Sequence, residues 1–222
     1  MNIMLLLPLI SCGQDGSKNI EGMTNDKEIK YLALGDSYTI GQSVKISERY
    51  PVLLSESLNK LEYKVNPPDI IAKTGWTTDE LMVALKAQEV KNDYDLVTLL
   101  IGVNNQYRGR DIEEFRVQFS ELLEIAIEYA KGDPANVIVI SIPDWSVVPF
   151  AKDRNRKKIA REINRFNAVK KEETLKRNVA FVDITPISRK AKNNLTYVAG
   201  DDLHFSGKMH QLWVDEIIRT NF

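Results

Sequence analysis

Short, almost uninterrupted apolar runs alternate with longer amphipathic segments from about residue 31 to the end of the chain. Two of the runs, 96–101 and 137–142, contain almost no polar residues. Such runs are typical of strands that are covered on both faces, as in a parallel sheet. The predicted strands are residues 31–34, 70–72, 96–101, 137–142 and 180–184.

The segments between these runs repeat apolar residues every three or four positions, which predicts amphipathic helices. The helical repeats are Ile112, Phe115, Phe119, Leu122, Ala126 and Tyr129, then Ile159, Ile163, Phe166 and Val169, and finally Leu212, Trp213, Ile217 and Ile218 after Ser206 as a predicted N-cap. Alternation of strands and helices implies right-handed crossovers and a parallel sheet between two helical layers. The predicted fold is therefore α/β, a three-layer α/β/α sandwich with a five-stranded parallel sheet.

The first twelve residues have a different character. An apolar run of eight residues, 3–10, precedes Ser11 and Cys12. At about 1.5 Å per residue this run is too short to cross a ~30 Å hydrocarbon core, and it has the form of a signal segment. Leu9-Ile10-Ser11-Cys12 resembles the bacterial lipobox, although no Lys or Arg precedes the run. We therefore predict a secreted lipoprotein of the bacterial cell envelope, held on the membrane by a lipidated Cys12; the alternative is a buried N-terminal strand with a core cysteine.

Residues 13–29 contain three glycines, no aromatic residue and three scattered apolar side chains. A segment of this composition buries too little apolar surface to fold, so it is predicted to be a flexible tether. The resulting domain organisation is a signal segment at 1–12, a tether at 13–29 and one folded domain at 30–222.

Composition narrows the classes of function. The chain has 222 residues, 43% of them hydrophobic, and its 30 Lys and Arg against 31 Asp and Glu give a net charge of −1, which excludes a strongly basic nucleic-acid binder. One cysteine excludes an internal disulfide, and two histidines leave little room for a metal centre, so no metal is expected. Residues 152–177 carry eleven basic and four acidic side chains, which indicates a solvated helix face or, alternatively, a surface that attracts an anionic membrane or glycan.

Polar motifs follow three of the predicted strands, and another lies near the chain end. In parallel sheets the working site lies beyond the carboxyl ends of the strands, so these loops are expected to meet. A serine hydrolase needs a hydroxyl, a base, an acid that orients the base and donors for an oxyanion. Ser37, His204 and Asp201 supply the first three, while the N–H groups of Ser37 and Gly75 and the amide of Asn104 supply the donors.

Each motif taken alone also has a structural interpretation. Gly-Asp-Ser is common in turns, and paired asparagines often satisfy backbone groups. Asp201 and Asp202 could stabilise the start of the last helix through its dipole. The joint occurrence of the motifs in this order favours the hydrolase. Within it, Asp201 is a better candidate than Asp202, which does not fit the D-x-x-H spacing. His210 is assigned a structural role in the terminal helix.

These residues resemble the SGNH, or GDSL-type, hydrolase superfamily, over about residues 31–220. The resemblance implies a flavodoxin-like α/β/α sandwich, with Ser37 as nucleophile, Gly75 and Asn104 in the oxyanion hole, and Asp201 and His204 completing the triad. It also implies esterase, thioesterase, lysophospholipase or carbohydrate deacetylase activity without a metal or organic cofactor. The chain departs from the family pattern at Asn105, where an aspartate is usual.

The sequence therefore predicts a lysophospholipase-like serine esterase that acts on lipid or small acyl esters. The alternatives are a carbohydrate O-deacetylase of the same family and a non-catalytic glycan-binding lipoprotein; an FMN module is disfavoured because no phosphate-binding loop follows the first strand. The expected partners are an ester substrate, possibly an acetylated glycan, and the membrane through Cys12, but no nucleic acid. Candidate substrate-binding residues are Trp76, Asn105 and Trp145, the last within an apolar loop at 145–150.

Overall fold

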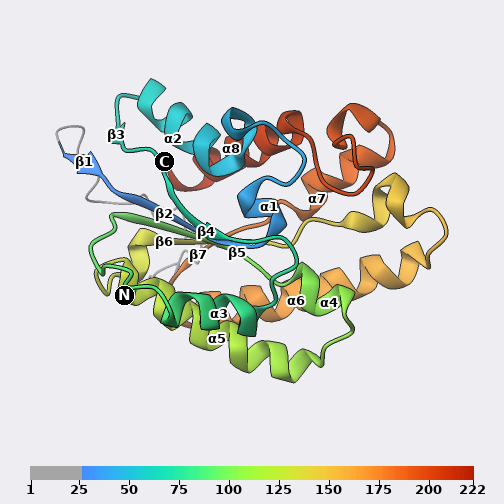
Figure 1. Ribbon diagram of the computed structural model, residues 1–222, viewed down its shortest axis with the longest axis horizontal. Coiled ribbons are helices and arrows are strands. Elements are labelled where there is room, and N and C mark those ends of the chain that lie inside the picture. The colour runs from blue at the N-terminus through green and yellow to red at the C-terminus, as the bar shows by residue number, and fades with distance from the viewer. Residues whose placement is uncertain (1–26) are drawn as a thin grey trace, which may run out of the picture.

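The computed structural model describes residues 27–222, in which a five-stranded parallel sheet lies between two helical layers (Figure 1). The predicted signal segment, Cys12 and residues 13–26 of the tether lie outside the described residues. In spatial order the strands are β4 (Asp69–Ala72), β2 (Tyr31–Gly35), β5 (Leu96–Leu100), β6 (Val137–Ile140) and β7 (Ala180–Val182). All five predicted strands are present and pair in parallel, so the predicted fold class is confirmed.

The helices divide between the two faces of the sheet (Figure 1). One layer contains α1 (Ser37–Ile40), α2 (Tyr50–Lys60), α7 (Thr185–Ser188) and α8 (Gly207–Asn221). The other contains α3 (Thr78–Lys86), α4 (Val103–Tyr107), α5 (Ile112–Tyr129) and α6 (Arg156–Lys176). Short 3₁₀ turns lie at Ile46–Glu48, Pro134–Asn136, Trp145–Val147, Pro149–Ala151, Arg189–Lys192 and Leu195–Tyr197.

The folded domain begins slightly earlier than the sequence predicted. Strand β1 (Glu28–Ile29) pairs in parallel with β3 (Lys64–Val65), and the Ile29 side chain is buried. Two residues assigned to the tether therefore belong to the domain. A two-residue strand has no hydrophobic period, so its pairing is set by tertiary contact rather than by local pattern.

Strands β2, β5 and β6 are buried along their whole length, as their apolar sequences require. The Thr98 hydroxyl in β5 lies 2.9 Å from the hydroxyl of Tyr31 in β2 and 3.2 Å from that of Tyr50. The Thr98 hydroxyl is thus satisfied inside the core, where an unpaired polar group would destabilise the fold.

The basic run at 152–177 covers the end of a loop and helix α6, and most of its basic side chains are exposed as predicted. Lys170 is the exception, because it is completely buried. Its ammonium donates to the carbonyl oxygens of Ile101 at 2.9 Å and Ile140 at 2.8 Å. Burial lowers the pKa of Lys170 to about 7. No helix within residues 27–222 combines the length and the apolar composition that crossing a membrane requires.

Helix α8 begins after Ser206, as predicted, but the Ser206 hydroxyl does not cap it and instead donates to the Thr196 carbonyl at 2.7 Å. His210, in the first turns of α8, is buried and stacks on Trp213 with ring centroids 4.6 Å apart. Its Nδ1 accepts a hydrogen bond from the Tyr50 N–H at 3.1 Å, so the imidazole carries its proton on Nε2. His210 therefore joins α8 to α2.

His210 should make the fold sensitive to acid. Burial lowers the pKa of His210 to about 3, against an ordinary value of 6.5. Between these two pH values the unfolded chain binds a proton at this imidazole that the folded protein does not. The free energy of unfolding therefore falls as the pH drops from about 6.5 toward 3. His210→Asn retains an acceptor for Tyr50 but cannot titrate. In urea unfolding at pH 7 and pH 4, the variant should be less stable at pH 7 yet lose less stability on acidification than wild type. Equal losses in the two proteins would contradict this role.

Candidate active site

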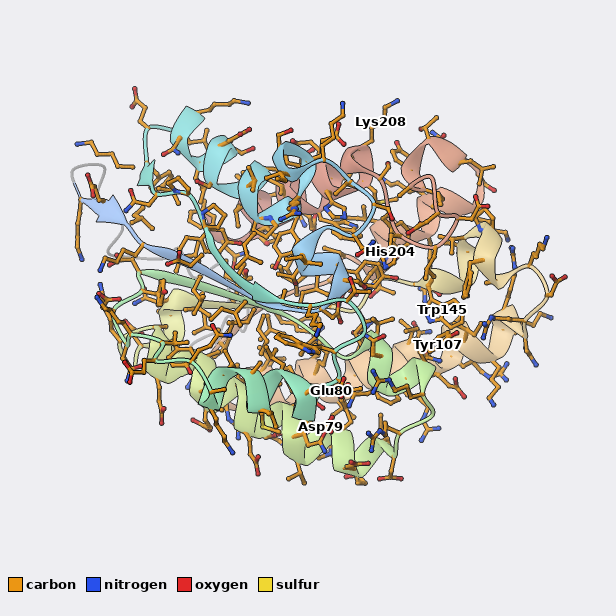
Figure 2. The ribbon with its side chains drawn as sticks, viewed as in Figure 1. Asp79, Glu80, Tyr107, Trp145, His204 and Lys208 are labelled. Carbon is orange, nitrogen blue, oxygen red and sulfur yellow. The ribbon has the colours of Figure 1, made fainter. Side chains whose placement is uncertain are left out.

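A pocket of about 200 Å³ lies beyond the carboxyl ends of β2, β4 and β5. Residues from five separate segments of the chain line it: Ser37, Tyr38, Thr74, Gly75, Val103, Asn104, Tyr107, Trp145, Leu203 and His204. Figure 2 shows His204, Trp145 and Tyr107 on the same side of the molecule, next to one end of the sheet. The loops that the sequence marked as functional therefore meet, as the strand-end rule requires.

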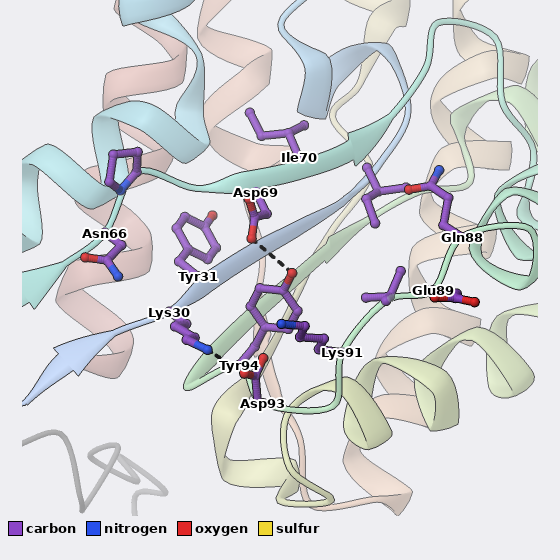
Figure 3. Close-up of a pocket in the computed structure, with 13 residues that line it drawn as sticks. Lys30, Tyr31, Asn66, Asp69, Ile70, Gln88, Glu89, Lys91, Asp93 and Tyr94 are labelled. Atoms are coloured by element: carbon purple, nitrogen blue, oxygen red, sulfur yellow. Dashed lines mark hydrogen bonds and ion pairs between the residues drawn. The ribbon is translucent and has the colours of Figure 1, made fainter.

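A larger cavity, of about 730 Å³, lies at the opposite end, where β2, β4 and β5 begin (Figure 3). Its polar side chains include Lys30, Asp69, Asp93 and Tyr94, and the Tyr94 hydroxyl donates to Asp69 at 3.0 Å. None of its lining residues is a histidine, serine or cysteine. The larger cavity therefore has no nucleophile and base of the kind that the smaller pocket contains.

Ser37 lies at a tight junction between β2 and α1. A side chain at Gly35 would place its Cβ 2.1 Å from Thr39 Oγ1 and 2.2 Å from the Leu100 carbonyl, so only glycine allows this close approach. Asp36 caps α1 by accepting from the Tyr38 N–H at 3.0 Å. The chain thus turns sharply from strand to helix and brings the Ser37 side chain to the pocket.

Asp36 is itself completely buried, and burial raises its pKa to about 7. Its Oδ1 accepts from Tyr38, whereas Oδ2 has no hydrogen-bond partner among residues 27–222. The positive charge of the buried Lys170 favours the ionised carboxylate and partly offsets the desolvation. The core thus holds two titratable groups whose charges influence each other, Lys170 and Asp36, the residue before Ser37.

His204 and Asp201 form a tight pair, with His204 Nδ1 2.6 Å from Asp201 Oδ2. The backbone N–H groups of Leu203 and His204 donate to Asp201 Oδ1 at 3.0 Å and 2.9 Å, and the Ser43 hydroxyl donates to Oδ2 at 2.6 Å. Burial alone would raise the pKa of Asp201, but these hydrogen bonds outweigh it and hold the pKa well below its usual range. The carboxylate therefore stays ionised and fixes the imidazole ring.

Ser43 was not predicted from the sequence. It lies in the loop after α1, in the left-handed region with φ 64°, and reaches Asp201 across 158 positions of the chain. Exposed serines in turns are common, so no local signal distinguishes this one. By contrast Asp202, which the D-x-x-H spacing excluded, is exposed and makes backbone hydrogen bonds: its N–H donates to the Ala199 carbonyl at 3.1 Å, and its carbonyl accepts from the Phe150 N–H at 2.9 Å.

Gly75 and Asn104 face the pocket from neighbouring loops. Gly75 adopts φ 88° in a turn closed by a hydrogen bond from the Trp76 N–H to the Lys73 carbonyl at 3.2 Å. The amide of Asn104 donates to the Trp76 carbonyl at 2.9 Å, which ties its loop to this turn. Two potential donors, the Gly75 N–H and the Asn104 amide, therefore lie on the same pocket as Ser37.

Two of the three predicted substrate-binding residues do not line the pocket. Trp76 contributes its carbonyl to Asn104, while its indole ring packs against the hydrophobic core. Asn105 is buried beneath α3, where its Oδ1 accepts from the Thr78 N–H at 3.1 Å and its Nδ2 donates to the Thr78 hydroxyl at 2.7 Å. The prediction that Asn105 binds substrate is therefore wrong, because both ends of its amide are used to hold α3.

Trp145, the third predicted residue, does line the pocket. Its ring is nearly buried, and its Nε1 donates to Gln106 at 2.8 Å. Tyr107, whose ring centroid lies 5.5 Å from that of Trp145, and Phe150, at 6.3 Å, continue an aromatic group toward solvent. Tyr107 was not predicted, because a tyrosine in a helix carries no signal of exposure to a pocket.

The described residues contain no group of three or more His, Cys, Asp or Glu side chains arranged to hold a metal ion. The pocket instead combines a hydroxyl, an imidazole bound to an ionised carboxylate, and backbone and amide N–H groups. This set of groups is suited to nucleophilic attack on a carbonyl followed by stabilisation of an oxyanion.

The class of the protein follows from the fold, the site and comparison with known proteins. The sequence model of the GDSL-like lipase/acylhydrolase family matches residues 33–212. The chain belongs to this family and thus to the hydrolases that act on ester bonds, which confirms the resemblance noted from the motifs. No curated protein sequence matches the chain.

Several solved structures share the fold. The lipase Lip_vut3 from a goat rumen metagenome has a TM-score of 0.70 at 18% identity, over 86% of this chain and 97% of that one. The acetylxylan esterase Axe2 from Geobacillus stearothermophilus has a TM-score of 0.67 at 18% identity, covering 86% and 93%. The psychrotrophic esterase EstA from Pseudoalteromonas sp. has a TM-score of 0.65 at 16% identity, covering 86% and 95%. At these identities the likeness concerns the fold.

The two neighbouring asparagines should behave differently when truncated. Asn105→Ala leaves the buried N–H of Thr78 without a partner and should lower the free energy of unfolding by about 1–3 kcal/mol. Asn104→Ala is the matched control, because its side chain lines an open pocket where water can replace it, and its loss should be clearly smaller. Urea unfolding of both variants measures the difference; equal stabilities would contradict a structural role for Asn105.

Proposed function

We propose that the protein is a serine esterase that hydrolyses esters of small acyl groups through Ser37, His204 and Asp201. The observation that carries the proposal is that Ser37, His204, Gly75 and Asn104 line one pocket, with the imidazole bound to an ionised carboxylate on its far side. A volume of about 200 Å³ suits an acyl group of a few carbons better than a long lipid chain, since pockets for larger ligands are roughly 300–1,000 Å³.

In the proposed reaction His204 accepts the proton of the Ser37 hydroxyl while Ser37 Oγ attacks the acyl carbonyl carbon. Because Asp201 occupies Nδ1, the imidazole is left with Nε2 as its base. The carbonyl oxygen gains negative charge, which the N–H groups of Ser37 and Gly75 and the amide of Asn104 stabilise. Loss of one such donor typically lowers kcat by about 10²–10³.

The tetrahedral intermediate collapses with cleavage of the bond to the alkoxy oxygen, and His204 returns the proton to the leaving alcohol. Water then attacks the acyl-enzyme, with His204 again as base, and releases the carboxylic acid and free Ser37. Asp201 holds the imidazole in one orientation through both steps. None of these steps draws on a metal or cofactor.

A carbohydrate O-deacetylase is the second candidate. The half-exposed rings of Tyr107 and Phe150 beside Trp145 favour it, because exposed aromatic faces next to a small acyl pocket suit the apolar face of a sugar. A solved acetylxylan esterase shares the fold. Initial rates on acetylated xylooligosaccharides and on aryl acetates, at equal concentration of ester bonds, separate the two candidates.

Ser37→Ala should abolish labelling by a fluorophosphonate probe and lower the turnover of p-nitrophenyl acetate by several orders of magnitude, since loss of the nucleophile costs about 10⁶ in a comparable triad. Circular dichroism should be unchanged, because the side chain makes no core contact that alanine lacks. Retention of more than a few per cent of the turnover would show that Ser37 is not the nucleophile. If wild type neither reacts with the probe nor hydrolyses any ester, a non-catalytic glycan-binding role replaces the esterase.

We also propose that the protein is a cell-envelope lipoprotein anchored through Cys12. The support is the apolar run and the cysteine at the position expected in a lipobox. Several acyl chains would hold the protein firmly, at roughly 0.8 kcal/mol for each buried CH₂. Cys12→Ser should move the protein from the membrane fraction to the soluble fraction. Wild-type protein that is entirely soluble, with an unmodified Cys12 by mass spectrometry, would end this proposal.

A further inference from the structure

The turn that contains Gly75 needs an external support. Its closing hydrogen bond, from Trp76 N–H to the Lys73 carbonyl, and the positive φ of Gly75 are the features of a type II turn. Rotation of the peptide plane between Thr74 and Gly75 changes the direction of the Gly75 N–H, and the adjoining plane, between Gly75 and Trp76, carries the Gly75 carbonyl. Glycine has no side chain that packing could hold, so groups that bind the carbonyls of the turn must fix the orientation.

Arg108 binds one of these carbonyls. Its Nη2 donates to the Gly75 carbonyl oxygen at 2.6 Å, and its Nη1 donates to Glu80 Oε1 at 3.1 Å. The two donors belong to one rigid guanidinium, so the position of Glu80 determines where the second donor meets Gly75. Arg108 itself follows directly after α4, one residue beyond Tyr107 of the pocket.

Glu80 is in turn fixed at the start of α3, where Figure 2 labels it beside Asp79. Its Oε2 accepts from the Thr77 N–H at 2.9 Å in a capping box. This backbone hydrogen bond, followed by the hydrogen bond from Arg108, lowers the pKa of Glu80, so the carboxylate keeps its charge in mild acid. A continuous set of contacts thus runs from the helix cap through Glu80 and Arg108 to Gly75.

We propose that Arg108 is a positioning residue for the oxyanion hole: it fixes the Gly75–Trp76 peptide through the Gly75 carbonyl and thereby anchors Gly75, whose own N–H, in the preceding peptide, points into the pocket. This inference rests on the proposed function, in which Gly75 donates to the oxyanion. Asn104 holds the next carbonyl, that of Trp76, from the pocket side. Arg108 and Asn104 therefore clamp consecutive carbonyls of the same turn.

The chain offers a matched control in Arg110. Its side chain has the same exposed fraction as that of Arg108, 40%, and lies two residues further along the same loop. It faces Asp79 at 3.9 Å and Glu114 at 3.6 Å, with no contact to the Gly75 turn. Arg108→Met and Arg110→Met remove the same charge; the first breaks one surface ion pair and the second two, but only the first frees the Gly75 carbonyl.

Arg108→Met should lower kcat for p-nitrophenyl acetate about tenfold with little change in KM, a smaller loss than the 10²–10³ that follows deletion of an oxyanion donor. The inhibition constant of a boronic acid, whose tetrahedral adduct with serine places an oxygen in the hole, should rise by a similar factor. Arg110→Met should match wild type in both measurements. The melting temperatures of the two variants should fall by a similar small amount, about 2 °C or less, because exposed ion pairs add little stability.

Two further variants test the route through Glu80. Arg108→Lys should have a kcat between those of Arg108→Met and wild type, because a single ammonium group lacks the two fixed N–H donors with which the guanidinium binds both Gly75 and Glu80. Glu80→Gln retains the capping box but weakens the contact with Arg108, so kcat should fall less than in Arg108→Met. In the double variant Glu80→Gln/Arg108→Met, kcat should fall no further than in Arg108→Met.

Suppose that Ser37→Ala abolishes turnover but Arg108→Met keeps the wild-type kcat. That result would overturn this inference and leave the proposed esterase function intact. An equal loss of kcat in Arg110→Met would also overturn it, because the effect would then come from charge alone. Persistence of turnover in Ser37→Ala would instead refute the proposed function. The two failures are therefore distinguishable in one set of assays.

Discussion

The structure depends on the burial of β2, β5 and β6 on both faces. Inside such a sheet every peptide group must pair, and the ladder satisfies this requirement only as far as the strands run side by side. At the carboxyl end of β5 the register with β6 ends at Leu99 and the register with β2 ends at Leu100, so the carbonyls of Leu100 and Ile101 lie at the end of the ladder. Thr39 donates to the first at 3.4 Å and Lys170 to the second at 2.9 Å.

Lys170 has a second acceptor in the Ile140 carbonyl, at the end of β6. One buried ammonium therefore holds two strand ends as they separate, just before the loops that carry Asn104 and Trp145. A buried cation needs compensation, and the carboxylate of Asp36 supplies negative charge from the end of β2. Thr39, Asp36 and Lys170 do not line the pocket themselves, but they stabilise the strand ends from which the loops of the pocket begin.

A helix, strand or site residue can be predicted from the sequence when its physical cause lies in neighbouring residues of the chain. The five strands and the three longest helices, α5, α6 and α8, were predicted because burial on one or both faces leaves a period in the sequence, whereas α2 and α3 were not predicted. Ser37, Gly75, Asn104 and His204 were predicted to meet because parallel strands place their following loops at one edge, and the structure brings them to one pocket. The pairing of β1 with β3 depends on two residues from each segment and leaves no such period.

The residues that were missed or wrongly assigned act through contacts between distant loops. Ser43 binds Asp201 and Lys170 binds two strand ends, but a serine in a turn and a lysine in a basic helix look ordinary in sequence. Asn105 was assigned to substrate because it follows Asn104 in the same motif. Consecutive side chains at the start of α4 point in different directions, so one amide faces the pocket while the other is buried against Thr78.

A division between chemistry and specificity follows from this arrangement. Among the groups proposed for catalysis, His204 is bound to Asp201 within one loop and Asn104 to the turn that contains Gly75, so a change in either disturbs its neighbours. The aromatic rim is built differently: Tyr107 and Phe150 are half-exposed, and Arg154 lies over both rings, 5.2 Å and 4.8 Å from their centroids. These rim side chains can change with little effect on the core. Under the proposed function, the rim is the part that can vary to select the alcohol or sugar, while the constrained loops carry the ester chemistry.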